Sequence, residues 1–405
     1  MAIGLGPLPE MLPVNGFRLG TASAGVKTPG RQDLVVMELA AGCRVAAVFT
    51  RNRFCAAPVL LAREHLQEQA PRYLLVNTGN ANAGTGERGL RDARACCEAL
   101  AERAGVDAGQ VLPFSTGVIG EPLPVDRIRA GLPAALAALS ERGWAEAAAG
   151  ILTTDTVPKG ASVRLQLDGG PVTITGIAKG AGMIRPDMAT MLAFIATDAA
   201  LPQGLLDQAL RDAVRYSFNR ITVDGDTSTN DACVLVATGA AGVNLSEEGS
   251  PGYRHFVAAL ADVCRTLAQA IIRDGEGVTR FITVAIEGGA TESECEAVAY
   301  TIAHSPLVKT AAFAGDPNWG RILAAIGRAG LDDLDVNGVR IWLDDYLIAE
   351  QGGRAEYYQE SEAAARMARE EITIRVDLAR GGAEATVWTT DFSYDYVRIN
   401  AEYRS

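Results

Sequence analysis

A threonine near the middle of the chain, Thr190, stands where its hydroxyl could act as a nucleophile. It follows the small residue Ala189 and precedes the apolar run Met191 to Ala196, within KGAGMIRPDMATMLAFIATD (179–198). If the Ala189–Thr190 peptide bond is held distorted, the hydroxyl can add to the Ala189 carbonyl, and water can release the resulting ester. Thr190 would then carry a free α-amine, whose reference pKa of roughly 7.7 to 8.0 lets it accept the hydroxyl proton. Without this chemistry, Thr190 is a β-branched residue that favours a strand.

A nucleophile of this kind needs hydrogen-bond donors for the negative charge that develops on the attacked carbonyl oxygen. The stretch STGVIG (115–120) follows the apolar segment Val111 to Phe114 and predicts a turn between a strand and a helix. The hydroxyl of Thr116 and the backbone N–H of Gly117 could supply two such donors. The alternative is an ordinary helix cap formed by Ser115 and Thr116.

Other kinds of chemistry find less support. The three histidines, His65, His255 and His304, are far apart. Charged neighbours predict that His65 and His255 lie on solvated helix faces rather than in a metal site or a catalytic triad. The stretch NTGNANAGTGERG (77–89) lacks the lysine and Ser/Thr of a phosphate-binding loop, so tight turns explain its glycines. The seven cysteines form no C-x-x-C pair, which predicts a reducing compartment rather than a disulfide framework or a zinc site.

The composition is that of a globular protein, with 48% hydrophobic and 21% charged residues among 405. The net charge of −12 repels phosphate backbones and anionic lipid headgroups, which argues against nucleic-acid and membrane partners. The N-terminal residues lack the basic segment of a secretory signal, and we expect no apolar run of bilayer length. We therefore expect a cytoplasmic protein whose partners are small metabolites or other subunits.

Apolar periodicity and turn signals predict the elements that position these residues. We expect a hairpin over residues 34–50, broken at Gly42, and another in which strands 162–167 and 172–178 meet at Asp168-Gly169-Gly170. Further strands are predicted at 73–76, 111–114, 191–196, 281–287, 339–343, 372–377 and 385–388, and helices near 90–104, 144–151, 205–217, 254–273, 293–304, 318–329 and 360–368. The sequence thus predicts an α/β (mixed α+β) fold with a catalytic domain over residues 1–285 and a smaller C-terminal α/β domain over 286–405.

Eight motifs along the chain together resemble one family. They are NTGNANAG, STGVIG, TTDT, KGAGMIRPDMATML, DGDTSTND, RDGEG (273–277), SPLVKTAAFAGDPNWGRI (305–322) and INAEYRS (399–405). In this order they are similar to the ornithine acetyltransferase family of arginine biosynthesis, whose members are often also glutamate N-acetyltransferases. The resemblance runs from about Gly25 to Ser405.

The resemblance implies a fold and a maturation step. The fold would be a layered sandwich of sheets and helices, of the ornithine acetyltransferase and N-terminal-nucleophile aminopeptidase type, whose C-terminal tail returns to the active site. The chain would cleave itself between Ala189 and Thr190 into an α chain (1–189) and a β chain (190–405). The two chains would stay together as an α2β2 heterotetramer.

The resemblance also implies roles for single residues. Thr190 would be the nucleophile, and Thr116 and Gly117 would stabilise the oxyanion. The substrate contacts would be Thr156, Lys179, Thr190, Glu276, Asn400 and Ser405. Lys179 suits the α-carboxylate of an amino acid, and Glu276 suits an ammonium group. From the residues alone, Glu276 would by default be a solvated loop carboxylate, and Asn400 and Ser405 would be part of a frayed tail.

These expectations describe an acetyltransferase that works by a ping-pong route. Thr190 takes the acetyl group of N-acetyl-L-ornithine, ornithine leaves, and L-glutamate accepts the group; acetyl-CoA is left open as a second donor. No metal or organic cofactor is expected. Two alternatives stay open: an N-terminal-nucleophile aminopeptidase, in which water resolves the acyl-enzyme, and a non-catalytic metabolite-binding protein.

Overall fold

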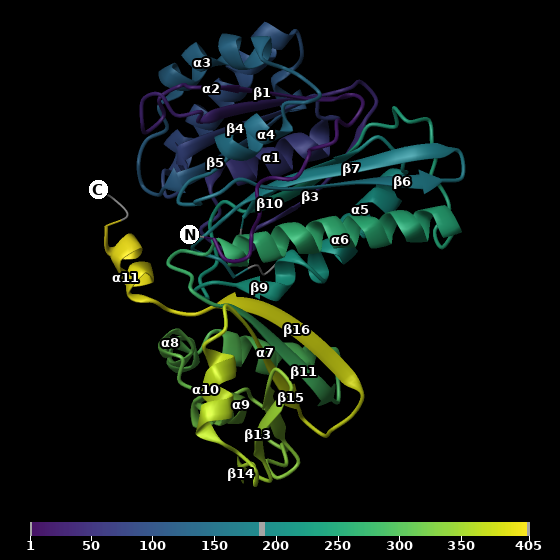
Figure 1. Ribbon diagram of the computed structural model, residues 1–405. Coiled ribbons are helices and arrows are strands. Elements are labelled where there is room, and N and C mark those ends of the chain that lie inside the picture. The colour runs from purple at the N-terminus through teal and green to yellow at the C-terminus, as the bar shows by residue number, and fades with distance from the viewer. Residues whose placement is uncertain (1, 186–190, 403–405) are drawn as a thin grey trace. The chain divides into compact units, whose positions relative to one another are not determined.

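The computed structural model describes residues 2–185 and 191–402, and Figure 1 shows their course. Contacts divide the chain into two compact units. The larger unit holds Gly6–Asn219 and Asp226–Ile271, and the smaller holds Met1–Leu5, Arg220–Gly225 and Ile272–Ser405. The boundary expected between residues 285 and 286 lies inside strand β11 (Phe281–Gly289), which belongs entirely to the smaller unit. The division into domains at that boundary stays a prediction.

Two sheets form the centre of the larger unit. The first has the strand order β1-β2-β4-β5, and the second has the order β3-β10-β8-β7-β6. Their strands are β1 (Phe17–Ala22), β2 (Leu34–Leu39), β3 (Arg44–Phe49), β4 (Tyr73–Asn80), β5 (Val111–Val118), β6 (Lys159–Leu167), β7 (Gly170–Lys179), β8 (Leu192–Thr197) and β10 (Ala232–Ala237). Each sheet contains one parallel pair, β4 with β5 and β8 with β10, among antiparallel ones.

One predicted hairpin is confirmed and the other is wrong. Strands β6 and β7 pair directly across the turn at Asp168-Gly169-Gly170. The strands within residues 34–50 instead belong to different sheets, because β2 pairs with β1 and β4 whereas β3 pairs with β10. Gly42 does break the run, with φ of +82°. A reversal at a glycine can return a strand to its neighbour or pass it to a facing sheet, and the apolar pattern is the same in both cases.

An apolar core lies between the two sheets. The rings of Phe114 and Phe194, one from each sheet, meet edge to face with centroids 5.1 Å apart. Trp144 of helix α4 (Trp144–Gly150) packs into the same core and stacks on Phe17 at 5.2 Å. Helices α1 (Ala57–Glu68), α2 (Gly86–Ala104) and α3 (Val125–Ala137) cover the other face of the first sheet, and α5 (Gln203–Arg215) and α6 (Pro251–Arg273) cover that of the second. This helix–sheet–sheet–helix order confirms the predicted layered, mixed α+β fold.

Two expectations about helices in the larger unit need correction. By length and composition alone, α6 is apolar enough to cross a membrane, contrary to the expectation that no run reaches bilayer length. Its residues Phe256, Leu260 and Leu267 are buried in the protein, as in a core helix. His65 is not on a solvated face; it is buried on α1, and its Nδ1 lies 2.8 Å from the carbonyl oxygen of Val111. His255 is exposed on α6, as expected.

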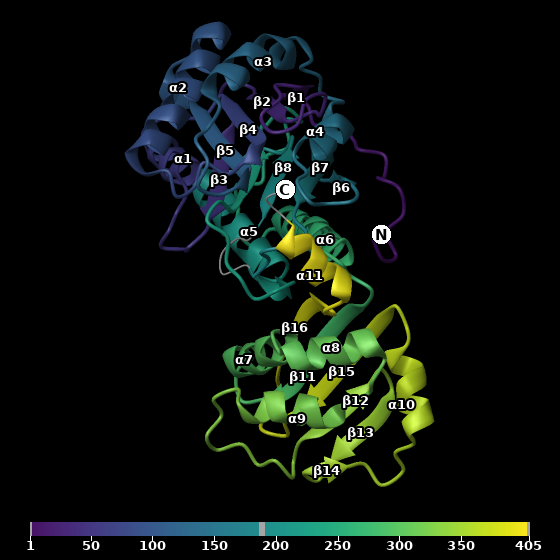
Figure 2. The same ribbon diagram turned by 90° about the vertical axis from the view of Figure 1, so that its left-hand side faces the viewer.

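The smaller unit is a sheet covered by helices on one face. The strand order is β14-β13-β12-β15-β11-β16-β9. Besides β11, the strands are β9 (Ile221–Thr222), β12 (Arg340–Leu343), β13 (Tyr346–Glu350), β14 (Gly353–Arg354), β15 (Glu371–Asp377) and β16 (Ala383–Thr390). The helices are α7 (Glu292–Ala303), α8 (Pro306–Ala314), α9 (Trp319–Gly327), α10 (Glu360–Met367) and α11 (Tyr394–Ala401). Figure 2 shows α7, α8 and α9 in front of the sheet, with which they share one apolar core.

Candidate active site

Three predicted site residues, Thr116, Gly117 and Lys179, lie at strand ends in the larger unit. Lys179 is the last residue of β7, and its Nζ donates to Thr116 Oγ1 at 3.2 Å and to Thr153 Oγ1 at 2.7 Å. Only 11% of the Lys179 side chain is exposed. We call the group formed by Thr116, Thr153, Asp155, Lys159 and Lys179 the Lys179 cluster.

Asp155 holds the two lysines of this cluster in place. Its Oδ1 accepts hydrogen bonds from Lys159 Nζ and from the Gly180 backbone, both at 2.7 Å, and its Oδ2 lies 4.0 Å from Lys179 Nζ. The side chains of Asp155 and Lys159 are fully buried. Burial alone would raise the pKa of Asp155, but the two lysines and the hydrogen bonds outweigh it and hold that pKa well below its usual range. The carboxylate is therefore ionised and balances buried positive charge.

Thr116 and Gly117 lie within strand β5, not in a turn or a helix cap. Helix α3 begins only at Val125, after a loop. Gly117 has φ of +135°, and a β-carbon there would lie 2.3 Å from the carbonyl carbon of Gly79 on β4. Only glycine fits this close approach. Among the described residues β5 pairs only with β4 and forms an edge of its sheet, and Thr116 and Gly117 are half-buried there.

An asparagine that the sequence analysis did not single out, Asn230, forms hydrogen bonds next to this strand end. Its Nδ2 donates to the carbonyl oxygens of Ala81, at 2.5 Å, and of Ser115, at 2.9 Å. Ser115 Oγ in turn donates to Asn77 Oδ1 at 2.6 Å. The motifs NTGNANAG, STGVIG and DGDTSTND thus meet in one hydrogen-bonded network. In the sequence, the signal for this network was the polar run DGDTSTND directly before the apolar strand β10.

The second sheet places Lys179 beside the strand that follows Thr190 in the sequence. Lys179, Leu192 and Ala232 are paired in register across β7, β8 and β10. The Ala232 backbone N–H donates to the Met191 carbonyl at 2.9 Å. Ala189 and Thr190, the predicted cleavage site and nucleophile, lie outside the described residues.

The TTDT segment contributes Thr153 to the Lys179 cluster. Thr153 Oγ1 accepts the hydrogen bond from Lys179 Nζ, and the Thr153 backbone N–H donates to Asp155 Oδ2 at 3.0 Å. Thr156 is exposed. A substrate contact at Thr156 stays a prediction.

In the smaller unit, the predicted residues Glu276 and Asn400 form a pair. Asn400 Nδ2, on the exposed helix α11, donates to Glu276 Oε2 at 2.8 Å. Glu276 is 6% exposed, so it is not the solvated loop carboxylate of the alternative interpretation. Ser393 caps α11 and donates to the Gly277 carbonyl at 2.5 Å, which ties the helix to the loop that carries Glu276. Ser405 lies outside the described residues.

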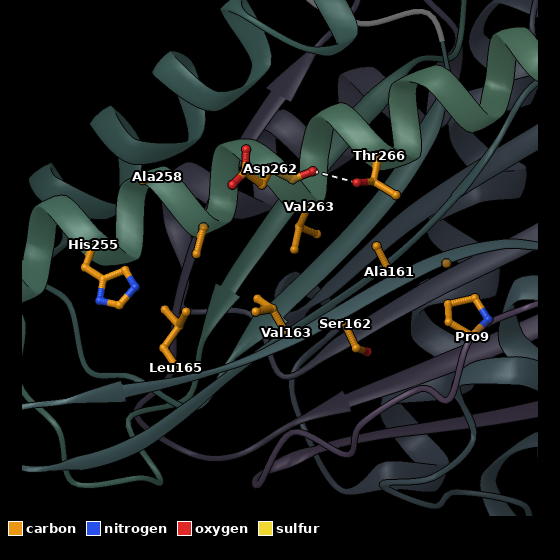
Figure 3. A pocket seen from close by; sticks show the side chains of 12 residues that line it. Pro9, Ala161, Ser162, Val163, Leu165, His255, Ala258, Asp262, Val263 and Thr266 are labelled. Carbon is orange, nitrogen blue, oxygen red and sulfur yellow. Dashed lines mark hydrogen bonds between the residues drawn. The ribbon is translucent and has the colours of Figure 1, made fainter.

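A groove of about 490 Å³ in the larger unit is lined by none of the predicted residues that the structure describes. Figure 3 shows Val163 and Leu165 of β6 facing Ala258 and Val263 of α6 across it. Its lining is mainly apolar, and it lacks the hydroxyl and ammonium groups of the Lys179 cluster.

The fold and the Lys179 cluster define an α+β enzyme whose site offers hydroxyl groups, a lysine and a glycine backbone at the ends of strands. The ArgJ family matches residues 18–405. The arginine biosynthesis bifunctional protein ArgJ of Pseudomonas syringae pv. tomato is 59% identical over 406 residues, covering 100% of both chains. The chain belongs to the ArgJ family.

Two solved structures are also similar. The arginine biosynthesis bifunctional protein ArgJ of Bacillus halodurans is 41% identical, with a TM-score of 0.50, and the match covers 52% of this chain and 99% of that one. Ornithine acetyltransferase of Mycobacterium tuberculosis, complexed with ornithine, is 37% identical with a TM-score of 0.42, over 45% of this chain and 98% of its own. The family resemblance drawn from the motifs is confirmed. It favours an arginine-biosynthesis acetyltransferase over an aminopeptidase or a non-catalytic binding protein.

Proposed function

We propose that this chain is a self-cleaving acetyltransferase that moves the acetyl group of N2-acetyl-L-ornithine to L-glutamate through an acetyl ester on Thr190. Membership of the ArgJ family supports the acetyl transfer. The self-cleavage, the nucleophile and the order of the steps rest on the sequence around Thr190 and on the Lys179 cluster.

The hydrogen bond from Lys179 to Thr116 is the observation that carries this proposal. A hydroxyl that accepts from a lysine keeps its own proton for a second partner. Thr116 is half-buried at a strand end, so its O–H can donate to a carbonyl oxygen that becomes negative. The Gly117 backbone N–H is the second proposed donor. Removing one donor of such a pair typically costs about 2.7 to 4 kcal/mol in the transition state.

The transfer takes place in two steps. The α-amine of Thr190 takes the proton of its own hydroxyl as Oγ attacks the acetamide carbon, and it passes the proton to the departing amine of ornithine. The amine of glutamate then attacks the acetyl ester and restores the hydroxyl. No metal or organic cofactor takes part.

The coverage of the Bacillus halodurans structure supports the cleavage. Nearly all of that chain is matched, at 99%, yet it covers only 52% of this one. Residues 190–405 are 216 of 405 residues, or about 53%. The solved chain therefore has about the length of the proposed β chain.

The proposal keeps five substrate contacts besides Thr190. Lys179 binds an α-carboxylate and Glu276 an ammonium group, while Thr156, Asn400 and Ser405 offer hydrogen-bonding groups. The α and β chains form an α2β2 heterotetramer in the cytoplasm. Acetyl-CoA is the second acetyl donor to test.

Mass spectrometry of the purified protein tests this proposal. We expect chains of 189 and 216 residues, and one acetyl group on the longer chain after incubation with N-acetylornithine alone. Glutamate should remove that group as N-acetylglutamate, whereas in an aminopeptidase water alone would remove it. Thr190→Ala should stay a single chain. Cleavage of that variant at the same bond would contradict the role of Thr190.

A further inference from the structure

Asp231, at the end of the DGDTSTND motif, is a buried carboxyl group with an unused oxygen. The residue is 4% exposed, and among the described residues its buried Oδ2 has no hydrogen-bond partner. Ser228 hydrogen-bonds to the carboxyl group. A buried polar atom without a hydrogen-bond partner costs free energy of folding. It therefore marks a candidate functional group.

The backbone neighbours of Asp231 contact described residues that flank the proposed site in the sequence. It directly precedes Ala232, whose N–H donates to the Met191 carbonyl, and Met191 follows Thr190 in the sequence. Its own carbonyl accepts from the Thr50 N–H at 2.9 Å, and the adjacent Asn230 is bound to Ser115 next to Thr116. The backbone of Asp231 is thus fixed on both sides.

Asp155 and Asp231 are two buried carboxyl groups that both interact with Lys179, yet their pKa values are shifted in opposite directions. Asp155 is held ionised by two lysines. Burial raises the pKa of Asp231 well above its usual range, and Ser228 and the charge of Lys179 offset this only in part. When the surroundings of two carboxyl groups shift their pKa values apart, the two groups commonly have different roles. Here one balances charge, and the other is the candidate for proton transfer.

We propose that Asp231 is the proton donor for the self-cleavage before Thr190, an inference that rests on the proposed function. When Thr190 Oγ adds to the Ala189 carbonyl carbon and the C–N bond breaks, the departing nitrogen must gain a proton. Asp231 gives its proton to that nitrogen and takes the proton of the Thr190 hydroxyl, so the carboxyl group ends as it began. Water then splits the ester into the Ala189 carboxylate and the free Thr190 hydroxyl.

Replacing the acid while keeping its shape tests the inference. In the full-length chain, Asp231→Asn should slow cleavage at least about a hundredfold, since a positioned acid or base typically contributes 10²- to 10⁴-fold. Intact-mass spectrometry after timed expression measures the uncleaved fraction. The matched control is Asp198→Asn. Asp198 follows the other end of β8, is 4% exposed, has a pKa raised by burial, and accepts from the Thr173 N–H at 2.7 Å. This control should cleave as the wild type does.

Chemical rescue separates proton donation from mere support of the fold. Purified uncleaved Asp231→Ala, checked for native circular dichroism, should cleave when formate is added, because a small acid can fill the space and supply the proton. Wild-type cleavage rates in Asp231→Asn, or a folded Asp231→Ala that formate does not rescue, would overturn the inference. If the wild type itself were never cleaved, the proposed function would fail at its first step, which is a different result.

Discussion

The Lys179 cluster of the larger unit and the Glu276–Asn400 pair of the smaller unit contrast in how they are supported. In the cluster, Asp155 and Lys159 are fully buried and Lys179 nearly so, and the strand ends of two sheets hold them. Asn400 instead belongs to an exposed eight-residue helix in which no side chain is buried. One group is fixed by the core of its unit, and the other by a few hydrogen bonds.

The difference has an energetic consequence. A buried charge that loses its partner leaves an uncompensated charge in a medium of low polarity, whereas an exposed group that loses its partner regains water. A change at Lys179 should therefore affect stability and catalysis together. A change at Asn400 should affect catalysis and leave folding nearly unaltered.

Asp155→Asn should have the largest effect. It removes the negative charge between two buried lysines and should lower the free energy of unfolding by about 3 to 5 kcal/mol. Chemical denaturation measures this loss. The control is Asp262→Asn, because Asp262 forms an exposed pair with Arg265, and its loss should cost less than about 0.5 kcal/mol. Equal losses in the two variants would break the contrast between buried and exposed charge.

The same carboxylate predicts the direction of a pH effect. Because the folded-state pKa of Asp155 is depressed, its stabilisation is fully present above the unfolded-state pKa of about 3.9 and is lost as the pH falls toward the folded-state value. Wild-type stability should therefore fall more steeply below about pH 4 than that of Asp155→Asn. Parallel curves for the two proteins would contradict this assignment.

Lys179→Met should have the next largest effect. It keeps the apolar stem but removes the ammonium that donates to Thr116, and we expect kcat/KM to fall about ten- to a hundredfold. Lys159→Met is the matched control, since it removes the other partner of Asp155 and leaves the Thr116 contact intact. Stability should fall in both variants, but the rate should fall mainly in Lys179→Met. An equal loss of kcat/KM would mean that Lys179 acts only through the fold.

Local patterns explain which elements could be predicted. The turn Asp168-Gly169-Gly170 allows little besides a hairpin, so β6 and β7 were predicted correctly. The pairing of β2 and β3 with different sheets depends on contacts far along the chain, which no local pattern contains. No helix was predicted at Tyr394–Ala401, where α11 lies, although Ser393, whose hydroxyl accepts from the Tyr396 N–H, was a usable capping signal.

The candidate site divides in a similar way. Thr116, Gly117 and Lys179 were predicted from motifs, and the fold brings them together. The need for glycine at 117 comes from its contact with Gly79, and the contact of Thr153 with Lys179 is seen only in the folded chain. Asp231 looked like an ordinary polar loop residue, because the burial of its Oδ2 without a partner among the described residues is seen only in the folded chain. Residue type and spacing indicate candidate chemistry. Which of several identical residues in a motif contacts the site depends on the tertiary structure.

Asn400→Ala should have the smallest effect and gives the sharpest test of the contrast. It removes the hydrogen bond to Glu276, and kcat/KM for N-acetylornithine should fall roughly tenfold, the lower range for a hydrogen bond to a charged group. The free energy of unfolding should change by less than about 0.5 kcal/mol, because the side chain is exposed. A chain ending at Glu402 keeps Asn400 but lacks Ser405, so its kinetics separate the two proposed contacts. Unchanged kinetics in Asn400→Ala would mean that helix α11 has a purely structural role. A large loss of stability would mean that the smaller unit depends on this pair as much as we expect the larger unit to depend on Asp155.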